Sequence, residues 1–228
     1  ANGLIFDPRG RLIVAEGANT GGGRRVSVTE PDGTVRTLAD GYQGKRFNSP
    51  NDVAVDAKGR VYVTDPRYVG DEPRELATMD VYRIDPDGTV ARLETTAKKP
   101  NGVVVSPDGK TLYVADSGNG RLALLALDLG EGGETSNPRV LRSFQGRGID
   151  GMTVTSDGRI VATSGSGAAA GVYVYTPKGE PLGMIPVPES PTNVEFGGPD
   201  RQTLYITAGK SLYRIKTTMS GAQLWPPR

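Results

Sequence analysis

Residues 51–63 read NDVAVDAKGRVYV, and this stretch decides the fold. It opens on Asn-Asp, continues into a short β-rich run, turns at a glycine and ends in a second β-rich run. The same pattern recurs in looser copies that begin at Asn2, Asn101, Asp150 and Asn193, so the leading residues are 49, 50, 49 and 43 positions apart. Self-similarity with a period of about 40–50 residues indicates a repeat architecture.

Each unit continues with a third and a fourth predicted strand around another turn. Clear examples of the third strand are residues 25–29, 81–84 and 171–175, each followed by a turn that contains Pro and Gly. Four short strands per unit are typical of a propeller blade, whereas the strands of a sandwich do not usually repeat with a shared leading residue. We therefore predict an all-β protein, a β-propeller with about five visible blade units. The helix-like stretch 72–79 is expected to be a Pro-interrupted insertion between strands.

Composition narrows the possible chemistry. The 228 residues include 32 Gly and 17 Pro at regular intervals, which indicates turns rather than disorder. The formal net charge of +1 gives no reason to expect nucleic acid or a membrane surface as a partner. No Cys and no His are present, which excludes thiolate sites, His-dependent triads and His-ligated metals. Any metal must be held by oxygen, which favours calcium or magnesium, with manganese also possible.

The leading residues of the units form the candidate site. The first strand of each propeller blade lines the central channel, so equivalent positions of successive blades converge on one axis. Asn2, Asn51, Asn101, Asp150 and Asn193 share this position in the repeat and would bring amide oxygens and one carboxylate together. Each could instead shape only the turn before its strand, and Asn2 and Asn193 are the weaker members. Five copies in register favour a ring that binds a hard cation.

Six stretches of the chain form an ordered set of motifs: GKRFNSPNDV at 44–53, YVTDPRY at 62–68, KPNG at 99–102, YVADS at 113–117, IDGM at 149–152 and TLYIT at 203–207. In these stretches the chain resembles the gluconolactonase branch of the SMP-30/gluconolactonase/LRE-like family. In this order and spacing they are a specific signature that covers almost the whole chain.

The resemblance implies a six-bladed propeller that hydrolyses a sugar lactone such as gluconolactone. It also implies one divalent cation at the channel mouth, usually Ca²⁺, with Mg²⁺, Mn²⁺ or Zn²⁺ as alternatives. Three of its ligands map onto Asn51, Asn101 and Asp150. The cation would polarise the lactone carbonyl, and Asp150 would position or deprotonate the attacking water. Residues expected near the sugar are Asn48, Asp52, Asp116, Arg46 and Tyr68, and for each of the five a structural role is an equal alternative.

One departure from the family pattern concerns its fourth ligand, a Glu in a blade upstream of the Asn-Gly-Leu unit with which this chain begins. Glu16 follows the second strand of its unit, which is the wrong position to replace that ligand. We expect residues 1–228 to form a single propeller domain whose N-terminal blade is missing or incomplete. An incomplete sequence is favoured over a five-unit variant, because a missing blade leaves open strand edges.

Two other functions stay open at this stage: a non-catalytic propeller that binds a protein or a carbohydrate, and an aryl-ester or phosphotriester hydrolase that uses the same cation. The expected partner is a small-molecule lactone, and a monomer is the expected state. No signal peptide is evident at Ala1, so periplasmic, secreted and cytoplasmic locations are all compatible with the sequence.

Overall fold

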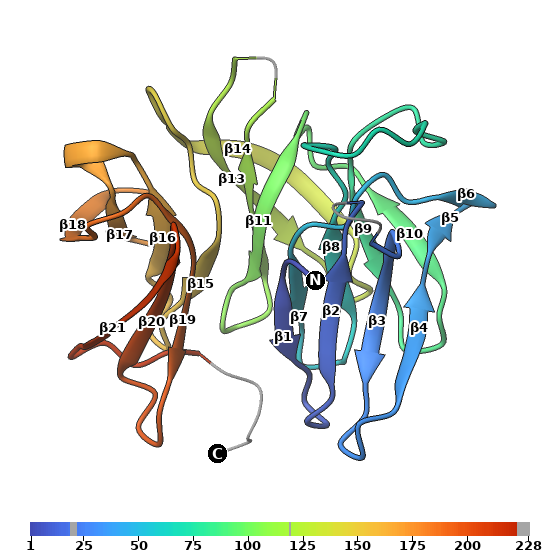
Figure 1. Cartoon of the computed structure of the whole chain (residues 1–228), viewed down its shortest axis with the longest axis horizontal. Helices are drawn as coiled ribbons and strands as arrows, with labels where there is room; N and C mark the ends of the chain where they lie inside the picture. The colour runs from blue at the N-terminus through green and yellow to red at the C-terminus, as the bar shows by residue number, and fades with distance from the viewer. Residues whose placement is uncertain (19–21, 119, 223–228) are drawn as a thin grey trace.

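The computed structural model describes residues 1–18, 22–118 and 120–222, and within these ranges the protein is almost entirely β-structure. Four sheets of four antiparallel strands and one of three strands lie side by side as five propeller blades (Figure 1). The prediction of an all-β propeller is confirmed. The described part of the chain contains no helix long and apolar enough to cross a membrane.

The strands of each blade follow one another in sequence from the inner to the outer edge. Blade 1 contains β1 (Leu4–Phe6), β2 (Leu12–Glu16), β3 (Arg25–Thr29) and β4 (Val35–Ala39). Blade 2 contains β7 (Val53–Val55), β8 (Val61–Thr64), β9 (Val81–Ile84) and β10 (Val90–Leu93). Blade 3 contains β11 (Pro100–Val105), β12 (Thr111–Asp116), β13 (Ala123–Leu129) and β14 (Thr135–Ser143).

Blade 4 contains β15 (Met152–Val154), β16 (Ile160–Ser164), β17 (Gly171–Tyr175) and β18 (Pro181–Pro186), with the 3-10 turn η2 (Gly167–Ala169) before β17. Blade 5 contains β19 (Pro191–Gly197), β20 (Thr203–Ala208) and β21 (Ser211–Lys216). A small hairpin, β5 (Gly41–Tyr42) with β6 (Lys45–Arg46), connects blades 1 and 2. Residues 72–79 form no helix.

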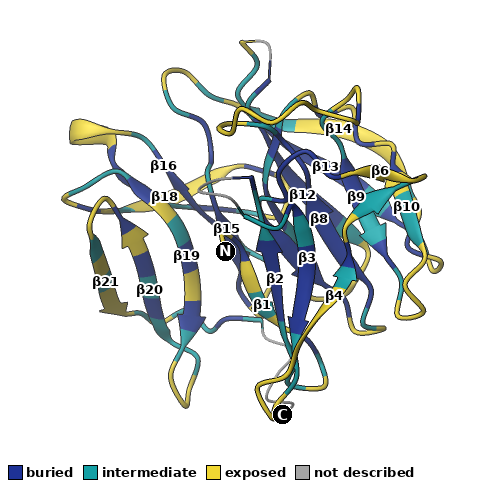
Figure 2. Ribbon diagram, turned by 45° about the vertical axis from the view of Figure 1, so that its right-hand side comes forward, coloured by how far each residue is buried: buried dark blue, intermediate teal, exposed yellow. Residues whose placement is uncertain are grey.

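The hydrophobic core consists of four clusters, one between each pair of successive blades. Strand alternation explains this arrangement, because successive side chains point to opposite faces of a sheet. In β12, Leu112 and Val114 pack against blade 2, whereas Tyr113 and Ala115 pack against blade 4. The middle strands are therefore apolar on both faces, while the outer strands β14, β18 and β21 are largely exposed (Figure 2).

The described residues do not close the ring. Blades 1 and 5 lie on either side of an open sector (Figure 1), and the face of β1 toward it leaves Leu4 and Phe6 exposed, at 55% and 45%. The sixth blade that the resemblance implies is therefore not found among the described residues, whereas the five units found in the sequence are all present.

Candidate active site

Backbone hydrogen bonds bring the starts of the inner strands together around the axis. The amide of Gly3 donates to the carbonyl of Asn51 (2.7 Å), Gly102 to Asp150 (2.9 Å) and Gly151 to Thr192 (2.8 Å). Each bond joins one blade to the next at the residue that leads the repeat. Residues about 50 positions apart are thereby neighbours, as the repeat predicts.

The fifth unit is shifted by one residue from its predicted alignment. Val194 and Phe196 occupy the core positions that Met152 and Val154 occupy in blade 4, so the residue that leads blade 5 is Thr192. The assignment of Asn193 as a leading residue is wrong. The cause is an extra residue at the end of the first strand of blade 5: its hairpin continues past the core residue Phe196 to the pair of Gly197 and Thr203, whereas the hairpin of blade 4 ends at the pair of the core residue Val154 and Ile160.

Glycine follows the leading residue in blades 1, 3 and 4 because the blades approach one another closely there. A Cβ on Gly102 would lie 2.4 Å from the carbonyl oxygen of Asp150, and one on Gly151 would lie 2.3 Å from Oδ1 of Asn193. Blade 2 carries Asp52 at this position instead. The Asp52 carboxylate accepts a hydrogen bond from the amide of Val103 (3.1 Å) and so links blade 2 to blade 3.

A cavity of about 290 Å³ lies at this end of the channel. It is lined by the leading residues of all five blades, together with Asp52, Glu195 and several apolar side chains of the inner strands. The predicted metal ligands Asn51, Asn101 and Asp150 thus line one cavity. The Asn51 amide makes no side-chain hydrogen bond to any other residue that the structure describes, so its oxygen is available to a ligand.

A larger cavity of about 590 Å³ lies at the opposite end, where the first turns of the blades meet. Ile5, Ala54, Val104 and Glu195 line both cavities, which are therefore two halves of one channel. The larger half has mostly apolar walls and contains none of the leading residues. Its size does not make it the reactive end, because the convergent polar groups belong to the smaller half.

Asp150 is the only carboxylate among the leading residues. Its Oδ2 accepts a hydrogen bond from the Arg147 guanidinium at 3.0 Å, and its side chain is 31% exposed. Partial burial raises the pKa of Asp150, and the hydrogen bonds and charge from Arg147 and Asn101 oppose this rise. Asp150 is thus anchored at the cavity but still open to solvent.

Two further carboxyl groups line the same cavity. Burial raises the pKa of Asp52 to about 7, amide hydrogen bonds oppose the rise, and the charges of Asp150 and Glu195 add to it. Glu195 opens into the channel, where it accepts a hydrogen bond from the Thr153 hydroxyl at 3.0 Å. Partial desolvation raises the pKa of Glu195 above its ordinary value. The cavity therefore concentrates negative charge.

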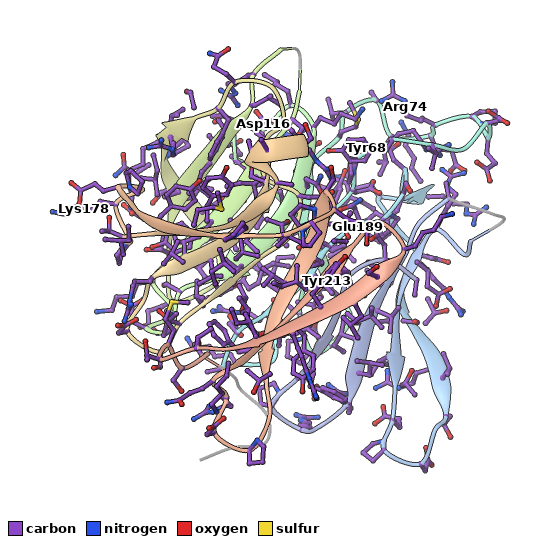
Figure 3. All side chains as sticks on the ribbon, turned by 60° about the vertical axis from the view of Figure 1, so that its left-hand side comes forward. Tyr68, Arg74, Asp116, Lys178, Glu189 and Tyr213 are labelled. Carbon is purple, nitrogen blue, oxygen red and sulfur yellow. The ribbon has the colours of Figure 1, made fainter. Side chains whose placement is uncertain are left out.

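Tyr68 lies at the rim of this end, and Figure 3 shows it at the same end of the molecule as Asp116. Its hydroxyl interacts with Ser117 and Asn101, and burial of that hydroxyl raises the pKa of Tyr68 to about 12. The Lys99 ammonium lies 4.1 Å from the centre of its ring. Tyr68 is therefore placed beside a predicted metal ligand, where a substrate could meet it.

The other predicted sugar contacts are engaged elsewhere. Arg46 is exposed on β6 and donates to the carbonyl of Gly23 (2.9 Å). Asn48 is fully buried, and its amide group donates to the carbonyls of Asp65 and Thr78. The side chain of Asp116 is 0% exposed and takes part in four contacts described below. None of the three lines the cavity, and neither does Tyr68. The Tyr68 hydroxyl contacts the leading residue Asn101, whereas the side-chain hydrogen bonds of these three residues go to other residues.

Asp116 holds the loop that precedes β11. Its Oδ1 accepts hydrogen bonds from the amides of Lys98 and Lys99 (both 2.9 Å) and of Gly118 (3.2 Å), and its Oδ2 is paired with Arg121. Asp65 occupies the equivalent position of blade 2 and accepts the amides of Asn48 and Ser49, each at 2.7 Å. Both carboxylates therefore hold the backbone that precedes the leading residue of their blade.

The chemistry of the cavity fits a hard cation. Its donors are amide, hydroxyl and carboxylate oxygens, the ligands that calcium and magnesium prefer. A divalent cation would also relieve the repulsion among Asp52, Asp150 and Glu195. Within the described residues, no three or more His, Cys, Asp and Glu side chains form a metal cluster, so amide oxygens would have to supply much of the coordination. Glu16 is paired with Arg25 (3.0 Å) and, as expected, does not line the cavity.

Three residues of the site were not predicted from the sequence: Thr192, Glu195 and Arg147. Glu195 could have been found once the fifth unit was aligned correctly, because it stands where the other units have Ile5, Ala54, Val104 and Thr153. Arg147 lies three residues before Asp150, and nothing in the repeat marks it as special. Its role depends on a side-chain direction that only the structure shows.

Comparison with known proteins agrees with this architecture. The family model described as "SMP-30/Gluconolactonase/LRE-like region" matches residues 1–210. A gluconolactonase from Zymomonas mobilis is 32% identical over 97% of this chain and 64% of its own length. A pentonolactonase from Haloferax volcanii is 33% identical over 90% of this chain and 62% of its own length.

A solved gluconolactonase from Xanthomonas campestris superposes with a TM-score of 0.83 and 32% identity, covering 94% of this chain and 71% of that structure. The chain thus spans less than two thirds of the length of the two curated relatives named above. The agreement of the family model, the sequence relatives and the propeller geometry leads to one conclusion: this chain belongs to the SMP-30/gluconolactonase/LRE-like family.

Proposed function

We propose that this protein is a calcium-dependent sugar lactone hydrolase that works at the smaller half of the channel. The single observation that carries the proposal is the convergence of Asn51, Asn101 and Asp150 on one cavity of about 290 Å³. That volume suits a single sugar ring, at the lower end of the range for small-molecule sites. The names of the relatives, a gluconolactonase and a pentonolactonase, support a sugar lactone as the substrate class.

The three proposed ligands would have different roles. Asn51 and Asn101 would offer amide oxygens to the cation, and Asp150 would offer its carboxylate. A bound calcium ion would supply Lewis-acid polarisation of the lactone carbonyl. Asp150 would also accept a hydrogen bond from the attacking water and take up its proton.

The rim would orient the substrate. The Tyr68 hydroxyl, already in contact with Asn101, is placed to bond a sugar hydroxyl at the mouth. Asp52 is buried next to the leading residues and accepts a hydrogen bond from the amide of Val103. It would therefore act through its negative charge, which contributes to the electrostatic potential of the cavity. For Asn48, Asp116 and Arg46 the proposal is an indirect role, through the loops that carry the leading residues.

Hydrolysis of gluconolactone in a pH-stat, corrected for spontaneous hydrolysis, tests the proposal. We expect activity with calcium, loss of activity with a chelator, and a fall of about 10²-fold or more in Asp150→Asn. Asp128→Asn is the matched control, since Asp128 forms an exposed pair with Arg139 on the outer strands of blade 3. Full activity in Asp150→Asn, or equal activity with and without chelator, would contradict the proposal.

An ester hydrolase is the alternative that this site also allows, because the same polarised carbonyl chemistry would serve an aryl ester. Measuring kcat/KM for an aryl acetate beside the lactone separates the two. A higher kcat/KM for the ester would reassign the substrate and leave the roles of the three ligands unchanged.

A further inference from the structure

The pair of Arg147 and Asp150 departs from what the other blades do at the same place. Arg147 lies three residues before the leading residue of blade 4, and its counterparts in blades 2, 3 and 5 are Asn48, Lys98 and Glu189. Asn48 turns to the carbonyls of Asp65 and Thr78, and Glu189 bonds the hydroxyl of Tyr213 at 2.7 Å (Figure 3). Lys98 is exposed and has no side-chain partner among the described residues. In this group of four, Arg147 is the one whose side chain contacts its own leading residue.

The backbone on both sides of the pair is held in place. The buried hydroxyl of Ser164 bonds the carbonyls of Arg147 (3.0 Å) and Gly148 (3.2 Å). Asp150 donates its amide to the carbonyl of Thr163 and accepts the amide of Gly102. With the backbone held, only the rotamers of the Arg147 and Asp150 side chains determine whether their 3.0 Å contact forms. Because Arg147 is 32% exposed and Asp150 31% exposed, the pair can open without unfolding the loop.

The pair competes with the cation that the proposed function requires. Asp150 is the only leading carboxylate, and the guanidinium occupies one of its two oxygens. A divalent cation on Asp150 would either lose that oxygen as a ligand or lie close to a positive charge. Arg147 also has no other acidic partner within the part of the chain that is described.

We infer that Arg147 acts as an internal counter-ion for Asp150: it neutralises the carboxylate in the cation-free protein, must leave it when a divalent cation binds, and so lowers the affinity of the site. The inference rests on the proposed function, since it assumes that Asp150 is a cation ligand. If the inference holds, Arg147, which is not one of the proposed ligands, controls the affinity of the site for the cation.

Calcium titration by calorimetry, on the whole chain after treatment with a chelator, tests the inference without reference to activity. Arg147→Gln is expected to bind calcium roughly tenfold more tightly than the original chain, because it removes both a competing ion pair and a repulsive charge. Arg147→Lys keeps the charge and is expected to stay within about threefold of the original chain. Arg139→Gln is the matched control, because it removes an arginine from an exposed pair with Asp128, and its affinity should not change.

Each outcome is decisive. Tighter binding in Arg147→Gln alone, or binding that appears only in this variant, supports the inference. Equal affinity in Arg147→Gln and the original chain overturns it and leaves the cation site intact. Weaker binding in a folded Arg147→Gln also overturns it, since Arg147 would then help to hold Asp150 for the cation. Absence of binding in every protein overturns both the inference and the calcium dependence of the proposed function.

Discussion

Replacing Asp116 with Asn tests whether this carboxylate contacts the substrate, as its motif suggested, or holds the fold, as its contacts indicate. Asp116 is fully buried, and its Oδ1 accepts three backbone amides. Its Oδ2 is bonded by Nε and Nη2 of Arg121, at 2.7 and 2.6 Å. The Asn side chain can keep its oxygen toward the amides, but its NH₂ group must then face the guanidinium.

The expected loss of stability follows from these contacts. A hydrogen bond to a charged group contributes about 1.5–3 kcal/mol, and two such bonds to Arg121 are lost. The three amide bonds remain but weaken, because their acceptor becomes neutral. Arg121 is 36% exposed, so water replaces part of what its guanidinium loses. We therefore expect Asp116→Asn to lower the free energy of unfolding by about 3 kcal/mol, near the low end for breaking a buried pair.

Urea unfolding, followed by circular dichroism, measures this change, and Asp128→Asn is the control. The side chain of Asp128, on β13, is exposed and pairs with the exposed Arg139 on β14, so the loss of this pair should cost less than about 1 kcal/mol. At a temperature where Asp116→Asn is folded, its KM for the lactone should stay within about twofold of the original value. A variant with unchanged stability and a raised KM would refute the structural reading and restore Asp116 as a sugar contact.

Three further changes probe the turns, the channel and the rim. Gly109 has φ +70° with open space around it, so Gly109→Ala should lower the free energy of unfolding in urea by about 1 kcal/mol. Gly183 also has open space around it but no positive φ, so Gly183→Ala should leave the free energy of unfolding unchanged or raise it by up to about 0.5 kcal/mol. Burial raises the pKa of Asp52 to about 7, so in the presence of chelator the titration of Asp52 should lower the free energy of unfolding by up to about 4 kcal/mol between about pH 4 and pH 7. A pH series should show a smaller decline in Asp52→Asn, where Glu195 and Asp65, whose pKa values burial also raises, still contribute; an unchanged decline would contradict the role of Asp52. Tyr68→Phe loses the hydroxyl that contacts Asn101 and should raise KM for the lactone about three- to tenfold with kcat nearly unchanged, and an unchanged KM would remove Tyr68 from the rim.

The blade pattern could be predicted from the sequence because each blade repeats the same short-range sequence signals for strands and turns. Alternating apolar residues in the second strands, a glycine or Asp-Gly at each turn and a shared leading residue all specify one supersecondary unit. The third strands predicted at 25–29, 81–84 and 171–175 agree with β3, β9 and β17 residue by residue. These features depend on neighbours in sequence, and the repeat supplies several copies of each.

Register in the fifth unit could not be predicted, because the turn there breaks the pattern on which the alignment depends. Gly197–Gly198 adds a residue, and the position that Gly109 and Gly158 fill in other blades holds Arg201 at φ +54°. A shift of one residue moves every side chain of the strand to the other face. With this shift Thr192 leads blade 5, Asn193 lies one position after it, and Glu195 lines the channel.

Some motif residues of this chain hold the backbone of the site, and others offer their side chains to the cavity, so a motif alone does not assign a residue to one group or the other. In blades 2 and 3 an aspartate after the second strand accepts backbone amides of the two residues that lie three and two positions before the leading residue. In blade 4, the Ser164 hydroxyl holds the equivalent backbone by donating to the carbonyls of Arg147 and Gly148. Because these groups fix the backbone, the side chains of Asn51 and Asn101 need not bond their own strand and can face the cavity. A motif carboxylate such as Asp116 therefore indicates where the backbone of a loop is held by hydrogen bonds. The side-chain amide of Asn101, which follows that loop, is the group that can bind a ligand.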